Sequence, residues 1–65
     1  MRSIVLDGLK MRVLDEYLQY VLVHRESADE YLILRNDIPH EYIVVQNFNN
    51  DKISAFKEFD NMKEN

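Results

Sequence analysis

Three dense apolar runs divide the chain, and each opens on the dipeptide Glu-Tyr followed by an aliphatic residue. Helix-like and strand-like patterns overlap in these runs, so each must be assigned from its periodicity and its flanking residues. The spacings between the three copies are unequal and shorter than the period of a solenoid repeat. We therefore interpret them as separate apolar segments, which cover residues 17–23, 31–34 and 42–45.

The second and third runs predict a central antiparallel β-hairpin, with strands over about 30–35 and 41–48. Both segments are rich in Tyr, Ile, Leu, Val and Phe, and Pro39 lies in the polar stretch between them. Apolar residues occupy both faces of this hairpin, whereas a sheet with one wet face would alternate apolar and polar residues. Both faces are therefore expected to be covered, by other parts of the chain or by a second copy.

The C-terminal segment predicts an amphipathic helix over about 51–63. Ile53, Phe56 and Phe59 fall on one side of a helical wheel. Asp51 is a candidate N-cap, and Lys63 suits the last turn. We expect this helix to close one face of the hairpin.

The N-terminal third fits two interpretations. Met11, Leu14 and Leu18 follow helical spacing, and the chain has a single glycine for tight turns. These points favour an N-terminal helix over about 11–25. Asp7-Gly8 between apolar segments is nevertheless a good two-residue hairpin signal. The alternative is a small five-strand meander or open barrel followed by the C-terminal helix.

Length and composition predict one small α+β domain spanning residues 1–65. The chain has no cysteine, so disulfides are excluded, and oligomerisation is a usual aid for domains of this size. The net charge is −4 and the basic residues are scattered, which makes direct nucleic-acid binding unlikely. No apolar run reaches the roughly 18 residues of a membrane span. No signal-peptide pattern is present at the start either, and we expect a cytoplasmic location.

Candidate chemistry is sparse. One glycine rules out a glycine-rich phosphate loop, and no serine has a histidine at a suggestive spacing. His24 and His40 with carboxylates are too few for a convincing metal site. We also expect little room for a pocket of ~300 Å³. The chain is therefore predicted to be non-enzymatic, with no cofactor, no metal and no catalytic residue.

The tyrosines are the most suggestive polar-tipped groups, because Tyr is enriched in protein interfaces. We expect an apolar patch on the hairpin to bind a protein partner. The chain would then be a small inhibitor or regulatory factor, with a homodimer as one form of this association. The predicted partner-binding residues are Tyr20, Tyr31, Ile33, Tyr42 and Val44.

An alternative function is an acidic decoy that mimics nucleic acid and blocks a DNA-binding protein. It requires a contiguous stripe of carboxylates whose binding weakens as salt is added. Twelve acidic residues against eight basic ones is a modest excess for a mimic. The predicted stripe consists of Asp15, Glu16, Glu26, Asp29 and Glu30.

Overall fold

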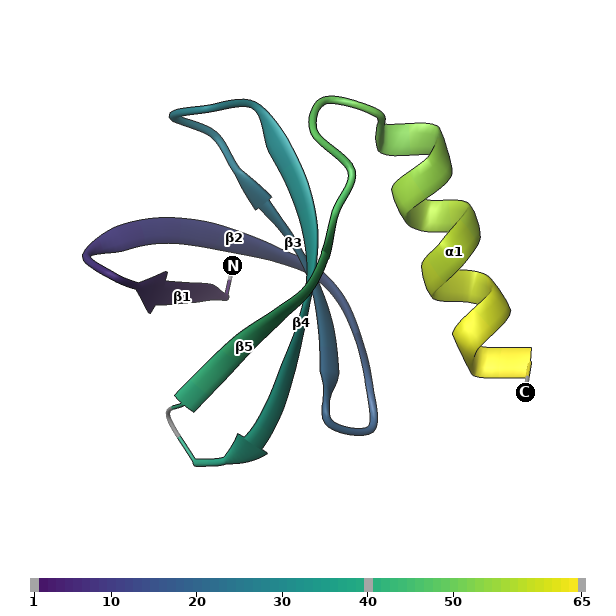
Figure 1. The fold of residues 1–65 in the computed structure, drawn as a ribbon, viewed down its shortest axis with the longest axis horizontal. Coiled ribbons are helices and arrows are strands. Elements are labelled where there is room, and N and C mark those ends of the chain that lie inside the picture. The colour runs from purple at the N-terminus through teal and green to yellow at the C-terminus, as the bar shows by residue number, and fades with distance from the viewer. Residues whose placement is uncertain (1, 40, 65) are drawn as a thin grey trace.

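The computed structural model describes residues 2–39 and 41–64, which form an open half-barrel of five antiparallel strands and one helix (Figure 1). The order of strands in the sheet is their order in the chain, so each strand pairs with its sequence neighbour. The elements are β1 (Ser3–Leu6), β2 (Leu9–Tyr17), β3 (Tyr20–Arg25), β4 (Glu30–Ile38), β5 (Glu41–Asn47) and α1 (Lys52–Glu64).

The predicted N-terminal helix over 11–25 is wrong, and the five-strand alternative describes this region. These residues form most of β2 and all of β3, joined by a tight turn. A bulge in β2 between Val13 and Asp15 explains the misleading pattern. An extra residue breaks the period of two, so that Met11 and Leu14 join different apolar clusters although their spacing is helical.

The tight turns are made with few glycines. Asp7 and Gly8 have φ of 54° and 78° and join β1 to β2, as the Asp-Gly signal indicates. Leu18, between β2 and β3, has a φ of 54°, a left-handed conformation that is uncommon for Leu. Counting glycines therefore underestimated the turns this chain can make.

The predicted β4–β5 hairpin is confirmed only in part. β4 continues to Ile38, three residues beyond the expected end, and β5 ends at Asn47. The extension has a backbone partner in the β2–β3 turn, because the Asn36 N–H donates to the Gln19 carbonyl oxygen at 2.8 Å. Residues expected in a loop are therefore drawn into the sheet, and the pairing contains two register shifts.

One face of the sheet covers itself by curling. Six buried side chains from β1 to β4 meet inside the half-barrel, and Leu6, Val13 and Tyr42 pack at their margin. We call these six the inner cluster. They are Ile4, Met11, Val21, Val23, Leu32 and Leu34.

The opposite face is covered by α1, which contacts β3 and β4. Phe59 and Ala55 pack against Leu22 and Ile33, and these four buried residues are the outer cluster. The helix agrees with the predicted segment to within one residue at each end. Asp51 is its N-cap.

The Asp51 carboxylate accepts the Ser54 N–H at 3.1 Å and the Ser54 hydroxyl at 2.7 Å. The side-chain and backbone hydrogen bonds from Ser54 lower the pKa of Asp51 below its usual 3.8. The cap is therefore formed at neutral pH, and its contribution is lost as pH falls through this lowered value.

Phe59 is fully buried, so truncating it tests the contact between helix and sheet. Phe59→Ala should lower the free energy of unfolding by about 3–5 kcal/mol, and Phe59→Leu by about 1–2 kcal/mol. Ile53, which is 82% exposed on the same helix, supplies the control. Ile53→Ala should change it by less than about 0.5 kcal/mol. Urea unfolding measures all three, and equal losses for Phe59→Ala and Ile53→Ala would contradict the packing described.

A substitution at Leu18 is expected to stabilise the fold, because this residue is 78% exposed and its backbone is in the left-handed region. Asn tolerates this conformation better, so Leu18→Asn should raise the free energy of unfolding by about 0.5–1 kcal/mol. Leu18→Ala removes the same apolar side chain but keeps the backbone cost, so it should give no such gain. A gain of equal size in both variants would show that backbone strain is not the cause.

Candidate functional site

The predicted partner-binding residues do not share one face. Tyr20 and Tyr31 pack half-buried around the outer cluster, on the side of α1. Ile33 is part of that cluster and only 1% exposed, so it supports the helix and offers no surface to a partner. Tyr42 and Val44 belong to the other side: Tyr42 packs on the inner cluster, and Val44 pairs with Leu34.

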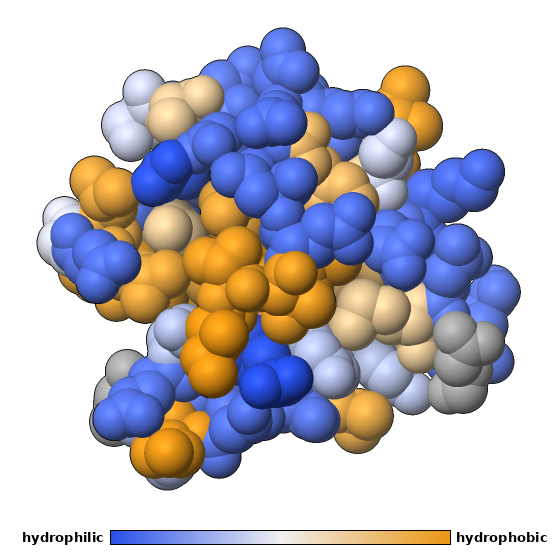
Figure 2. Space-filling model, in the orientation of Figure 1, coloured by the Kyte–Doolittle hydropathy of each residue, from blue (hydrophilic) through white to orange (hydrophobic). Residues whose placement is uncertain are grey.

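Three consecutive apolar residues of β5 remain accessible, whereas the other exposed large apolar residues are separate in the sequence: Val5, Leu9, Leu18, Ile38 and Ile53. Ile43, Val44 and Val45 are 52%, 46% and 48% exposed. Figure 2 shows apolar side chains gathered in the middle of the face where β5 lies in Figure 1, beside a notch in the surface. We call Ile43, Val44 and Val45 the β5 patch; as consecutive residues of an edge strand they lie along that edge and alternate between the two faces of the sheet. Of the three, sequence analysis singled out Val44 alone.

The chain leaves β5 without covering it. Phe48 and Asn49 remain bonded to β4: the Phe48 N–H donates to the Tyr31 carbonyl at 2.8 Å, and the Tyr31 N–H donates to the Asn49 carbonyl at 2.7 Å. Asn49 has a φ of 56°, which turns the backbone toward the helix. α1 then runs over β3 and β4, so the turn directs the only helix of the described residues away from the β5 patch.

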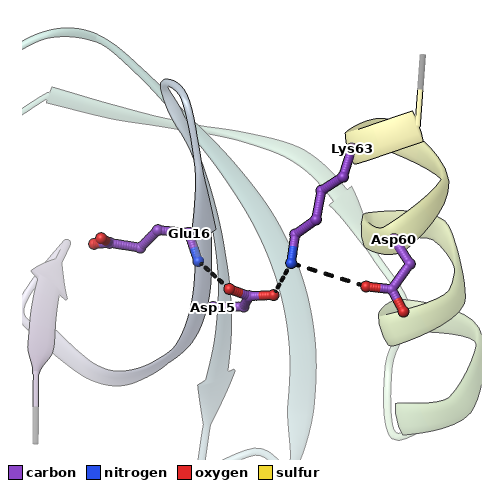
Figure 3. Close-up of polar contacts among 4 residues, drawn as sticks. All are labelled: Asp15, Glu16, Asp60 and Lys63. Atoms are coloured by element: carbon purple, nitrogen blue, oxygen red, sulfur yellow. Dashed lines mark hydrogen bonds and ion pairs between the residues drawn. The ribbon is translucent and has the colours of Figure 1, made fainter.

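The far end of α1 is fixed by an ion pair to β2. Lys63 donates to one carboxylate oxygen of Asp15, and the Glu16 N–H donates to the other at 2.8 Å (Figure 3). Asp60, one turn earlier in the helix, lies 3.9 Å from the Lys63 ammonium. The hydrogen bond to Asp15 raises the pKa of Lys63 above its usual 10.5. Both ends of the helix are therefore held over the outer face.

β5 is an edge strand whose one structural defence against further pairing is an irregularity at Val45, where β5 carries one residue more than β4. It pairs with β4 alone among the described strands, so one row of its backbone N–H and C=O groups faces outward. Natural edges are often protected by Lys or Pro, and residues 41–47 contain neither. An exposed apolar edge of this kind is a template for one more strand.

The carboxylates of the predicted acidic stripe have side-chain partners within the fold. Four of the five lie in ion pairs with Lys or Arg, and the fifth, Asp29, lies 2.9 Å from His24 Nε2. The pairs are Asp15–Lys63, Glu16–Arg2, Glu26–Arg12, Asp29–His24 and Glu30–Arg25.

A polar depression of about 350 Å³ is lined by Ser3, Lys10, Arg12 and Glu26. It is larger than we expected for so small a domain. Arg12 and Glu26 are 3.5 Å apart, so opposite charges in its lining pair with each other. Among the described residues that line it, Glu26 is the one carboxylate and none is a histidine.

His24 belongs to no metal site in the described part of the chain. His24 stacks on Tyr31 with ring centroids 4.3 Å apart, and its Nε2 lies 2.9 Å from an Asp29 oxygen. His40 lies outside the described residues. Among residues 2–39 and 41–64, no group of three or more His, Cys, Asp or Glu side chains is placed to hold a metal ion.

Comparison with protein-family models, curated proteins and solved structures gave no match. Within the described residues, α1 is the one helix, and it is too short and too polar to cross a membrane. Function is therefore inferred from the β5 patch and the contacts around it.

The Lys63–Asp15 pair predicts a pH-dependent stability difference. A raised pKa means that the contribution of Lys63 is complete below its ordinary 10.5 and is lost as pH rises through the raised value. Lys63→Met should therefore lower the melting temperature at pH 7. The difference in melting temperature between this variant and the unmodified chain should disappear at alkaline pH. Lys57→Met, at an exposed lysine of the same helix, is the control. A melting-temperature difference that persists unchanged above the raised pKa of Lys63 would contradict a role for the Lys63 charge.

Proposed function

We propose that the chain is a non-enzymatic protein-binding module, a small cytoplasmic inhibitor or regulatory factor that binds by adding a strand to β5. The observation that carries this proposal is the exposure of Ile43, Val44 and Val45 on an edge strand that the helix leaves uncovered. In strand addition the backbone hydrogen bonds supply affinity, and the side chains beside them supply specificity.

The geometry supplies both parts of such an interface. The outward backbone groups of β5 offer donors and acceptors along a seven-residue strand. The β5 patch offers apolar side chains that are each about half exposed, so a partner would remove their remaining area from water. Of the predicted partner-binding residues, Tyr42 and Val44 belong to this strand. Tyr20 and Tyr31 lie on the helix side and Ile33 is buried, so we assign them no direct contact.

The acidic decoy is the weaker proposal. A mimic of nucleic acid needs carboxylates that are free to meet a basic partner. Four carboxylates of the predicted stripe are ion-paired within the chain and Asp29 lies against His24, so freeing the stripe for a basic partner would break several contacts at once. Binding through the β5 patch requires no such rearrangement.

Site-specific photo-crosslinking tests the proposed surface. Ile43 is replaced by the photoreactive residue p-benzoylphenylalanine, and irradiation in host cells should give adducts of defined mass. The same residue placed at Ile53, which is more exposed but lies on α1, is the matched control and should give few or none. Mass spectrometry of the adducts identifies what lies against β5.

Two results would contradict the proposal. One is the absence of adducts from residue 43 while the protein is folded by circular dichroism. The other is an identical set of adducts from residues 43 and 53, because it would show that accessibility and not the β5 edge decides capture.

A further inference from the structure

We infer that the strand added to β5 is β5 of a second copy of this chain, which gives a two-fold symmetric homodimer with a sheet continuous across both copies. This inference rests on the proposed function and names the partner of the same surface. A two-fold interface is self-complementary, so the strand must match itself when it is turned end to end.

The sequence of β5 has that property. Antiparallel pairing centred on Val44 places each Ile43 opposite Val45 of the partner strand, and Val44 opposite its own copy. In this register Val44 meets its own copy on one face of the sheet, and Ile43 meets Val45 on the other. Val45 has no opposite residue in β4, and this register gives it one in the partner strand. Tyr42 then lies opposite Gln46, and the polar Glu41 and Asn47 lie at the ends. Apolar and β-branched residues in directly opposed positions stabilise a strand pair.

The charges of β5 also permit the pairing. Glu41 is the only ionised residue of the strand, and in this register it lies opposite the uncharged Asn47. The two Glu41 positions are at opposite ends of the added pair, roughly 20 Å apart at about 3.3 Å per residue. The Asn47 amide donates one N–H to Glu30 at 2.8 Å and carries a second N–H that can be donated to Glu41 of the partner strand.

The other edge of the sheet is a poorer template. β1 has only four residues, against seven in β5. Arg2 precedes it and is already paired with Glu16 of β2. Val5 is the one large apolar side chain of β1 that is mostly exposed, so the strand has no apolar patch to match. The two edges therefore predict different outcomes for the same kind of substitution.

The size of the chain gives an independent reason for a second copy. Sixty-five residues bury only about 60% of the surface that the unfolded chain exposes, and domains this small commonly depend on disulfides, metals or oligomerisation. The chain has no cysteine, and its described residues form no metal-binding group. Pairing at β5 would remove from water three consecutive apolar residues that the fold leaves about half exposed.

Sedimentation equilibrium over a concentration series tests the dimer. The unmodified chain should approach twice the 7.8 kDa of one chain as concentration rises. Val44→Lys should raise the dissociation constant at least about tenfold, because it places two lysines opposite each other across the axis. Val44→Glu should do the same. An equimolar mixture of the two variants should recover dimer, since opposite charges then meet.

Val5→Lys is the matched control, because it places the same charge on the other edge strand. Its dissociation constant should stay within about twofold of the unmodified value, and circular dichroism should show that all variants are folded. Amide hydrogen exchange of the unmodified chain gives a test that needs no substitution. Protection of residues 41–47 should rise with protein concentration, and protection of β1 should not.

The inference is overturned if the unmodified chain has the mass of one copy up to millimolar concentration, or if the variant mixture gains nothing over its components. A monomer that still forms adducts with other proteins from residue 43 would overturn the homodimer and leave the proposed function standing. Failure of the crosslinking at residue 43, with no concentration-dependent protection, would overturn both.

Discussion

The burial of Phe59 against Leu22 and Ile33 is the contact on which the arrangement depends. It fastens the only helix of the described residues to the middle of the sheet. The backbone bonds of Phe48 and Asn49 to Tyr31 hold the segment before the helix, and the Lys63–Asp15 pair holds its far end. One helix of thirteen residues cannot cover five strands. Its position therefore decides which part of the sheet stays open.

Two arrangements cover most apolar residues of the sheet. The inner face covers itself, because the strands curl until β1 and β4 share one cluster. The outer face of β3 and β4 is closed by α1. β5 receives neither treatment: it carries apolar residues on a sheet edge with no further strand of the described chain beside it. The β5 patch is therefore exposed because no element of the described chain covers it.

The sequence predicted the parts whose signals are local. The α1 segment has a cap and an apolar stripe, and β4 and β5 have strong strand composition, so their type was correct. The helix predicted for the N-terminal third was wrong for two reasons. A bulge beside Asp15 gives the apolar residues helical spacing, and Leu18 adopts a turn conformation that Gly or Asn usually adopts. The open edge was only partly foreseen. Which strand lies at the edge of the sheet depends on topology. The side of the sheet to which Tyr31 and Tyr42 point depends on register shifts that no local sequence pattern indicates.

The order of the strands has a consequence for how the chain acquires its structure. Every strand pairs with its immediate sequence neighbour, so each pairing closes a short loop and the sheet can grow hairpin by hairpin as the chain is synthesised. α1 comes after all five strands, so Leu22 and Ile33 stay bare until its residues have emerged. For that interval the nascent sheet exposes both its outer face and its β5 edge, and it is then most exposed to chaperones and to aggregation.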